Sequence, residues 1–317
     1  MLKNNASLSG VISIVVACVF WGTTGTAASF TPNVSPLATG AFSMGIGGVL
    51  LVISSLKHLF RDKERLLSQP KMLLAGGLSV AAYPLAFYSS MRLSGVAIGT
   101  VVSIASAPFF TVLLERLISK KTISLQWIIS FIFGGLGIVF LTAGKQSESG
   151  INPADNTLYW GILLGLIAGL TYATYSWAAR QMIEKGISSN SSMASMFGIA
   201  ALFLLPSLML TGDNLLTGPV NTAVAIYMAV IPMFLGYICF GFALRHIEAS
   251  KATLITLLEP AIATIFAITI VGEKFYSIGW IGMLFIGICL VLQVVKLPAK
   301  TKESDFRRFD DHISENF

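Results

Sequence analysis

One acidic residue, Glu259, lies in the otherwise apolar stretch TLLEPAIATIFAITIV and is the strongest candidate for chemistry in this chain. The surrounding run, 250–271, is long enough to cross a bilayer core of about 30 Å. A charged carboxylate at the bilayer centre costs about 2.5 to 3.5 kcal/mol on insertion scales, so such residues usually face a protein interior or a water-filled cavity. There a carboxyl group could bind a cationic group or exchange a proton.

Small hydroxyl residues share the predicted helix face of this acid. Residues three apart lie on the same face of a helix. Two such polar stripes end in a proline: Thr253, Thr256 and Glu259 before Pro260, and Thr100, Ser103 and Ser106 before Pro108. We therefore expect Ser103, Ser106 and Thr256 to contribute to the same site as Glu259, although hydroxyl groups can also bond helix carbonyls locally.

Prolines recur at matching places in the two halves of the chain. An interior proline removes the hydrogen bond to the carbonyl four residues earlier, which here would free the carbonyls of Ile104 and Thr256. The pairs are Pro84 with Pro232, and Pro108 with Pro260. We predict helix breaks at these four residues; the alternative is that they are kinks used only for packing.

The composition predicts an all-α integral membrane protein. The 317 residues are 55% hydrophobic and only 11% charged, with a mean hydropathy of +0.78, which is too apolar for the surface of a soluble protein. Apolar runs of about 17 to 25 residues predict ten transmembrane helices, near 10–30, 36–56, 72–91, 95–117, 125–143, 158–178, 191–210, 221–243, 250–271 and 277–296.

Basic residues predict the orientation of these helices. An even number of spans places both termini on one side, and with both termini cytoplasmic only Arg92, Lys145 and Lys274 of the 21 Lys and Arg residues lie outside. The net charge of +6 is thus a topology signal and does not predict nucleic-acid binding. We expect the plasma membrane, which is the inner membrane if the source is bacterial.

An internal repeat divides the chain at a spacing of about 153 residues. The anchors are Phe87 with Phe240, Arg92 with Arg245, and Trp127 with Trp280. The expected units are a cytoplasmic N-terminus (1–9), a first five-helix repeat (10–143), an extracytoplasmic linker (144–157), a second five-helix repeat (158–297) and a cytoplasmic tail (298–317). Because five is odd, equivalent helices cross the membrane in opposite directions, which is typical of secondary transporters with a substrate site near the midplane.

Aromatic residues in the spans are the next candidates for substrate contact. Their flat apolar faces and polar tips suit amphipathic or cationic ligands, and packing is the alternative role. The candidates are Trp21, Tyr83, Tyr88, Tyr172, Tyr175 and Tyr237. The histidines lie in loops or the tail, and no phosphate-binding loop or metal motif is present, so we expect no enzyme activity, no metal and no cofactor.

Several short motifs resemble those of the drug/metabolite transporter superfamily, EamA type, over about residues 8–297. They are Phe20-Trp21-Gly22, the SSMR and FALR segments, LEPAIA from Leu258 to Ala263, and Gly272-Glu273 before the last helix. The resemblance implies two inverted five-helix repeats and export of small metabolites, amino acids or toxic compounds. It also implies a cavity lined by the first, third, fourth, sixth, eighth and ninth of the ten predicted helices. The family often carries Gly-Glu in the first half too, where this chain has Ser119-Lys120, so Glu273 is interpreted as structural.

Three functions fit these residues. The first is a secondary transporter that exports small polar or amphipathic molecules by alternating access and exchanges protons through Glu259. The second is an uncoupled facilitator or substrate exchanger in which Glu259 is a ligand or a structural brace. The third is a structural membrane protein, which would have a dry, filled centre around Glu259. The expected partners are a small-molecule substrate, protons and the lipid bilayer.

Overall fold

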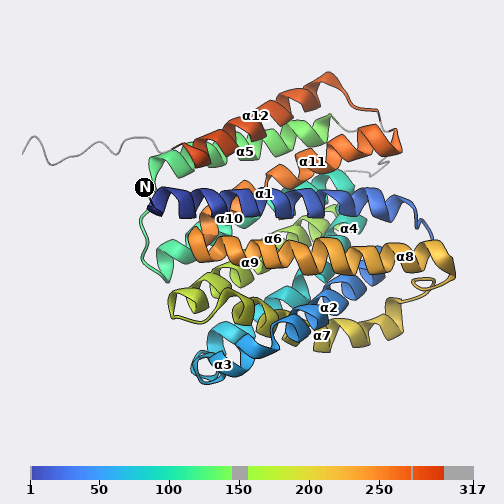
Figure 1. Cartoon of the computed structure of the whole chain (residues 1–317). Helices are drawn as coiled ribbons and strands as arrows, with labels where there is room; N and C mark the ends of the chain where they lie inside the picture. Colours follow the sequence, from blue (N-terminus) through green and yellow to red (C-terminus); the bar gives the residue numbers. More distant parts are fainter. Residues whose placement is uncertain (1, 145–155, 273, 296–317) are drawn as a thin grey trace, which may run out of the picture.

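The protein is a bundle of long helices that run roughly along one common direction (Figure 1). The computed structural model describes residues 2–144, 156–272 and 274–295. Glu273, most of the predicted linker (144–157) and the predicted tail (298–317) lie outside the described residues.

The ten predicted spans are confirmed, since ten helical segments in the described part of the chain are long and apolar enough to cross a membrane. Six helices each hold one span: α1 (Leu2–Ser29), α2 (Pro36–Ser54), α5 (Leu125–Ala143), α6 (Asn156–Glu184), α7 (Ser189–Thr211) and α12 (Ser277–Val294). The short helix α3 (Leu56–Leu67) is amphipathic and lies at one end of the bundle. The remaining four spans depart from a single regular helix.

The third and fourth spans, Pro70–Gly95 and Ile98–Leu117, are two helices that share the label α4 (Pro70–Leu117) and meet at a sharp kink at Gly95. Gly95 has φ 83° and ψ 153°, a conformation that residues with a side chain rarely adopt. The connection between these two spans is therefore short and turns at a glycine. Pro84 and Pro108 lie inside the helical parts of α4, so neither ends a helix.

The eighth and ninth spans are interrupted near their prolines. The eighth consists of α8 (Gly218–Met228), the π-helical segment η1 (Ala229–Leu235) around Pro232, and α9 (Gly236–His246). The ninth consists of α10 (Ala249–Ile255), α11 (Leu258–Phe266) and the π-helical segment η2 (Ala267–Val271). It breaks at 256–257, directly before Glu259 and Pro260, where the Thr256 carbonyl accepts the Glu259 N–H at 3.0 Å. The carbonyl released by Pro260 is therefore satisfied by a tighter turn.

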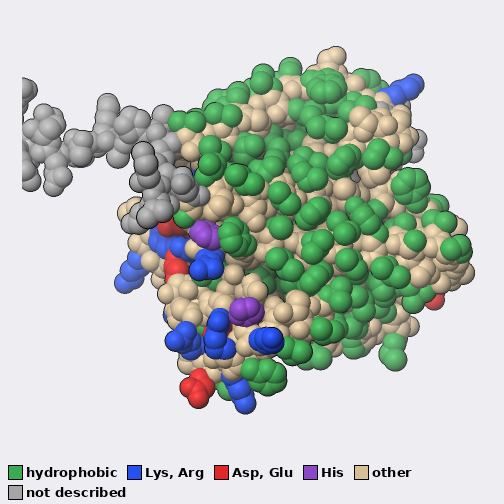
Figure 2. Space-filling view, in the orientation of Figure 1, with side chains coloured by type: hydrophobic (Ala, Val, Ile, Leu, Met, Phe, Trp, Pro, Cys, Tyr) green, Lys and Arg blue, Asp and Glu red, His purple; other side chains and the backbone are tan. Residues whose placement is uncertain are grey.

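Lys and Arg side chains gather at one end of the bundle, whereas the belt between the two ends is apolar (Figure 2). We call this the basic end; its described members are Lys57, Arg61, Lys63, Arg65, Lys71, Arg116, Lys120, Lys121, Arg180, Lys185, Arg245 and Lys251. The beginning of α1 and the end of α12 both lie there (Figure 1). This arrangement matches the charge separation on which the predicted orientation rests.

Asp62 fastens α3 to the beginning of α7 at the basic end. Its buried carboxylate accepts hydrogen bonds from the Ser188 backbone N–H (3.0 Å), the Ser191 hydroxyl (2.9 Å) and the Arg61 guanidinium (3.2 Å). Burial raises the pKa of Asp62, but the bonds from Ser188, Arg61 and Ser191 outweigh it and hold the pKa well below its usual range. The helix dipole at the N-terminus of α7 also favours this negative charge.

We predict that Asp62→Asn destabilises the protein by about 1.5 to 3 kcal/mol, because hydrogen bonds to a charged acceptor are lost in a buried place. The measurement is the thermal unfolding temperature in detergent at neutral pH, with Glu64→Gln as control, since Glu64 is exposed on the same helix.

The pH dependence gives a second check on the same residue. A depressed folded-state pKa stabilises the protein above the ordinary Asp value of about 3.9, and this stabilisation is lost as the pH falls through the folded-state value. The difference between wild type and Asp62→Asn should therefore shrink below about pH 4. An equal difference at all pH values would contradict the role of the charge.

Candidate functional site

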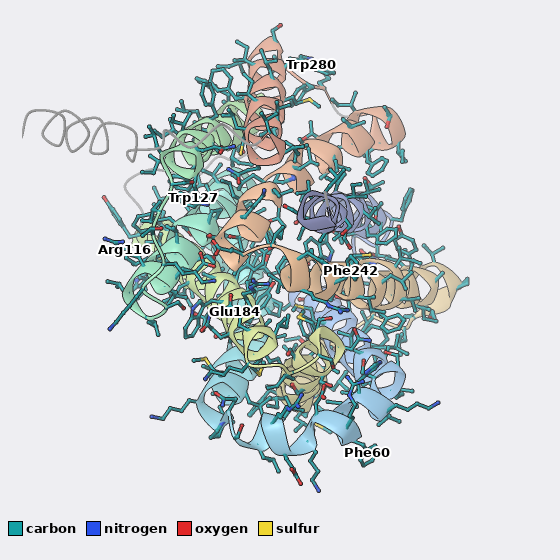
Figure 3. The ribbon with its side chains drawn as sticks, turned by 60° about the vertical axis from the view of Figure 1, so that its left-hand side comes forward. Phe60, Arg116, Trp127, Glu184, Phe242 and Trp280 are labelled. Atoms are coloured by element: carbon teal, nitrogen blue, oxygen red, sulfur yellow. The ribbon has the colours of Figure 1, made fainter. Side chains whose placement is uncertain are left out.

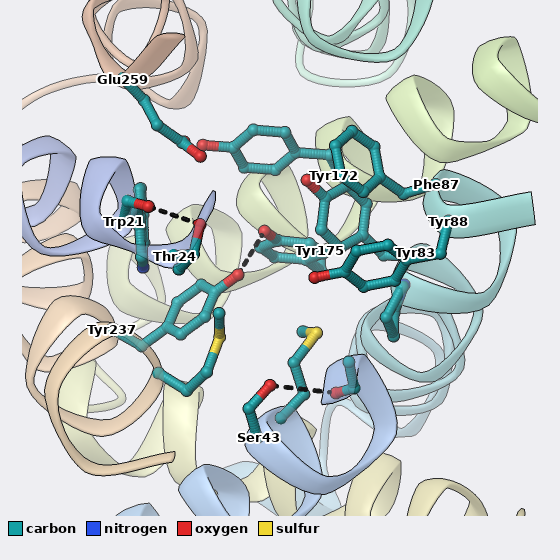
Figure 4. A pocket seen from close by; sticks show the side chains of 14 residues that line it. Trp21, Thr24, Ser43, Tyr83, Phe87, Tyr88, Tyr172, Tyr175, Tyr237 and Glu259 are labelled. Atoms are coloured by element: carbon teal, nitrogen blue, oxygen red, sulfur yellow. Dashed lines mark hydrogen bonds between the residues drawn. The ribbon is translucent and has the colours of Figure 1, made fainter. Parts of the chain in front are cut away.

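Glu259 and the predicted aromatic residues meet in one cavity near the middle of the bundle (Figure 4). Residues from α1, α2, α4, α6, η1, α9 and α11 enclose it. The lining residues are Trp21, Thr24, Gly40, Ser43, Met44, Tyr83, Pro84, Phe87, Tyr88, Tyr172, Tyr175, Met233, Tyr237 and Glu259. Because both halves of the chain contribute, the cavity lies between the two repeats.

The cavity holds a small empty space. Its empty space amounts to about 560 Å³, counting the part that is continuous with the surroundings, and the centres of water-sized molecules can occupy about 60 Å³ of it. This is room for a few water molecules or one small organic molecule. A dry, filled centre around Glu259, the mark of a purely structural protein, is not what the structure shows.

A connected cluster of aromatic rings forms most of the wall. Tyr172 stacks on Tyr175 with ring centroids 5.2 Å apart, and Tyr83 lies 5.6 Å from Tyr172. Trp21 lies 5.1 Å from Tyr237. The hydroxyl groups of Tyr175 and Tyr237 are hydrogen-bonded to each other at 3.1 Å.

The Glu259 side chain projects into the cavity toward Tyr172 (Figure 4). Within the described part of the chain no hydrogen bond or ion pair joins its carboxyl group to another residue. No Lys, Arg or His is among the described lining residues. A carboxyl group without a protein partner, in a cavity at bilayer depth, is available to a proton or to a ligand.

Glu259 is held in place by the break in the ninth span and by α1. The Tyr172 hydroxyl donates to the Thr256 hydroxyl at 3.1 Å, and the Thr256 hydroxyl donates to the Thr253 carbonyl at 2.8 Å. On the other side, Gly22 allows α11 to pack directly on α1, because a Cβ atom there would lie 2.7 Å from Ile262 Cγ2.

The Phe20-Trp21-Gly22 motif therefore has a structural explanation. The Trp21 indole N–H donates to the Pro232 carbonyl at 2.8 Å, within the π-helical segment η1. Gly236 has no side chain at the point where the indole passes, since a Cβ atom there would lie 2.6 Å from Trp21 Nε1. The Pro232 carbonyl thus helps to hold the Trp21 side chain in place. Pro84, another of the predicted helix-break residues, lines the cavity directly.

Ser103 and Ser106, predicted site residues, lie outside the cavity lining. They face α6, where Gly161, Gly165 and Gly169 let α4 approach closely, and a Cβ atom at Gly169 would meet the Ser106 hydroxyl and lie 2.8 Å from the Ser103 carbonyl. Thr256 also lies outside the lining and contacts two lining residues, Tyr172 through its hydroxyl and Glu259 through its backbone carbonyl. The fourth span, Ile98–Leu117, contributes no lining residue, contrary to what the resemblance implies.

Sequence reasoning missed the part of the wall that α2 provides. Gly40, Ser43 and Met44 line the cavity, and Gly40 leaves space for the ring of Tyr88. No charge or repeated motif marks these residues in the sequence. Phe87 was within reach, because it lies in the same aromatic segment as Tyr83 and Tyr88.

Comparison with known proteins fits this architecture. The model of the EamA-like transporter family matches residues 8–143 and 159–294, two stretches that together cover most of the chain. The chain belongs to the EamA-like transporter family. The family carries a duplicated unit, and the chain is a multi-pass membrane protein of this transporter family.

Similar proteins from bacteria extend over nearly the whole chain. The uncharacterized transporter YwfM of Bacillus subtilis is 29% identical and covers 92% of this chain and 96% of its own length. The uncharacterized inner membrane transporter YicL of Salmonella typhimurium is 22% identical, covering 87% and 92%. A crystal structure with 16% sequence identity superimposes with a TM-score of 0.74 over 90% of this EamA protein and 96% of its own chain, which shows the same fold.

We predict that Gly22→Ala destabilises the protein by about 1 to 3 kcal/mol, because the added methyl group overpacks the contact between α1 and α11. Gly25→Ala on the same helix is the matched control, since nothing lies within 4 Å of its added Cβ. The control should be neutral or slightly stabilising, as alanine favours a helix over glycine. Equal unfolding temperatures for both variants in detergent would contradict the close α1–α11 contact.

Proposed function

We propose that this protein is a secondary transporter that exports small organic molecules by alternating access and exchanges them for protons at Glu259. The observation that carries the proposal is the unpartnered Glu259 carboxyl in a cavity between the two repeats. Buried carboxyl groups favour the neutral, proton-loaded form, and an approaching cation or water favours the charged form. A single group could therefore alternate between proton and substrate during a cycle. The basic end is the cytoplasmic side in this proposal, in accord with the positive-inside rule.

Contacts between the repeats lie at the basic end. Lys121 of the first repeat forms ion pairs with Glu184 (2.8 Å) and Glu248 (3.5 Å) of the second. Burial lowers the pKa of Lys121, but Glu184 and Glu248 outweigh it and raise the pKa above its usual value, so Lys121 stays charged. These groups lie together at the basic end, where Figure 3 labels Glu184.

Two indole groups add uncharged hydrogen bonds between the two repeats. The Trp177 N–H donates to the Ser119 hydroxyl at 2.9 Å, and the Trp127 N–H donates to the Ser250 carbonyl at 3.2 Å. Both bonds join the first repeat to the second. Opening a path from the cavity to the basic end would break these contacts. In this proposal, they form in one state of the alternating-access cycle and break in the other.

The alternative is a facilitator or exchanger without ion coupling. It is favoured by the absence of a second acidic or basic side chain among the described lining residues, since proton relays in membranes are often chains of such groups. In that case Glu259 binds the substrate or braces α11 without carrying protons.

We predict that Glu259→Gln abolishes the dependence of transport on a pH gradient, because glutamine cannot release a proton. The measurement is flux into proteoliposomes, with and without an ionophore that collapses the gradient, and Glu64→Gln is the control. Gradient-driven flux that persists in Glu259→Gln would contradict proton coupling. Downhill flux in the wild type that ignores the gradient would support the facilitator.

We predict that Lys121→Gln loosens the basic end, because the ion pairs that join the two repeats are lost. Pairs at partly exposed places are worth only about 0 to 1 kcal/mol, so the change is local. Amide hydrogen exchange should become faster over 118–124 and 246–252, with Lys63→Gln, an exposed lysine on α3, as control. Unchanged exchange in both segments would show that these ion pairs do not hold the repeats together.

A further inference from the structure

We propose that the substrate of the central cavity is an organic cation, a protonated amine or a quaternary ammonium compound with an apolar or aromatic body. This inference rests on the proposed function, since it takes the cavity to be the transport site. It adds the chemical class of the substrate, which neither the family nor its similar members define.

Charge is the first argument. Glu259 is the only carboxylic acid in the described lining, and no basic side chain accompanies it. A charged ligand that enters such a low-dielectric site needs an opposite charge, because an unpaired buried ion costs several kcal/mol. A cation finds that partner in Glu259, whereas an anion finds none.

The aromatic wall is the second argument. Seven of the fourteen lining residues are Trp, Tyr or Phe. A cation is attracted to an aromatic face within about 6 Å of the ring centroid, and quaternary ammonium groups are commonly recognised by such cages. Neighbouring rings here lie 5.1 to 6.3 Å apart, so a cation beside one ring is also close to others.

The hydrogen-bonding state of the wall is the third argument. Most donors are already used: the Trp21 N–H by the Pro232 carbonyl, the Tyr172 hydroxyl by Thr256, and one hydroxyl proton of the Tyr175–Tyr237 pair. The hydroxyl groups of Thr24 and Ser43 donate to carbonyls of their own helices.

The groups without a partner among the described residues are the carboxyl of Glu259 and the hydroxyl groups of Tyr83 and Tyr88. The described lining contains no Arg or Lys side chain that could pair with a substrate carboxylate. A zwitterionic amino acid would therefore leave its carboxylate poorly compensated, whereas the corresponding amine would not.

The same geometry sets the exchange with protons. One carboxyl group holds either one proton or one monovalent cation, so one proton enters the site for each cation that leaves it. The titratable groups that face Glu259 are the thiol of Cys18 on α1 and the hydroxyl groups of Tyr83, Tyr88, Tyr172 and Tyr237. All of these are neutral when protonated, so the proton that competes with the cation is the one on Glu259, and cation binding should weaken as the pH falls.

The test compares three ligands of nearly equal shape: 2-phenylethylamine, the neutral 2-phenylethanol and the zwitterion phenylalanine. Binding to the purified full-length protein in lipid nanodiscs is measured by calorimetry. We expect the amine to bind at least tenfold more tightly than the other two, and its affinity to fall as the pH is lowered. Glu259→Gln should lose this preference, whereas Glu64→Gln should retain it.

A second pair of variants covers the case in which Glu259→Gln does not fold. Tyr88→Phe keeps an aromatic face in the cavity and should bind the amine several-fold more tightly than Tyr88→Leu, which removes that face. Equal affinity of these two variants would contradict the role of the aromatic wall.

Other outcomes separate this inference from the proposed function. Phenylalanine or phenylethanol bound as tightly as the amine, or no binding of the amine or of tetraethylammonium at millimolar concentration, would overturn the cation assignment. Proton-driven flux of a zwitterion or anion that depends on Glu259 would do the same and leave the transport function intact. Amine binding without any flux in proteoliposomes would support the site and overturn transport.

Discussion

A carboxyl group at bilayer depth constrains everything around Glu259. Its charged form is unfavourable among apolar side chains, so the protein has to provide either a charged partner, water or a proton. The described residues provide no charged partner. They provide a cavity instead, which helices of both repeats enclose and which Glu259 lines. The break at 256–257 belongs to this arrangement, because it releases α11 from α10 and lets the first turn of α11 carry the acid.

Close helix contacts set the dimensions of the cavity. Helices approach closely in membranes where small residues meet, since no hydrophobic force drives apolar helices together there. Gly22 brings α1 onto α11, and Gly236 admits the Trp21 indole to the Pro232 carbonyl. The glycines of α6 bring α4 near enough for Ser90 to donate to the Gly161 carbonyl at 2.7 Å. These contacts fix Trp21, Tyr83 and Tyr172 around the empty space, so the aromatic rings are held by backbone packing rather than by one another alone.

The sequence predicted the spans and the aromatic wall better than the polar stripes, for a physical reason. Hydropathy and charge are averaged over about twenty residues, so the ten spans tolerate errors at single positions. The three-residue spacing of Ser103 and Ser106 shows only that they share a helix face. Which neighbour this face meets depends on the rotation of the helix about its axis. In α4 the face packs against the glycines of α6 and not against the cavity. The wall from α2 could not be predicted because Gly40, Ser43 and Met44 carry no distinctive chemistry.

The two repeats differ at their matched prolines. Pro108 and Pro260 occupy equivalent positions in the two repeats. The fourth span stays helical through Pro108, whereas the ninth span is broken at 256–257, shortly before Pro260. The acid follows the same asymmetry, since Glu259 is in the second repeat and the first has Ala107 at the corresponding place beside Pro108. A second carboxyl beside Glu259 would repel it and hold one proton tightly between the two. A single acid in a cavity that both repeats enclose can instead be neutralised fully by one proton or one cation, and this favours an exchange of one for the other.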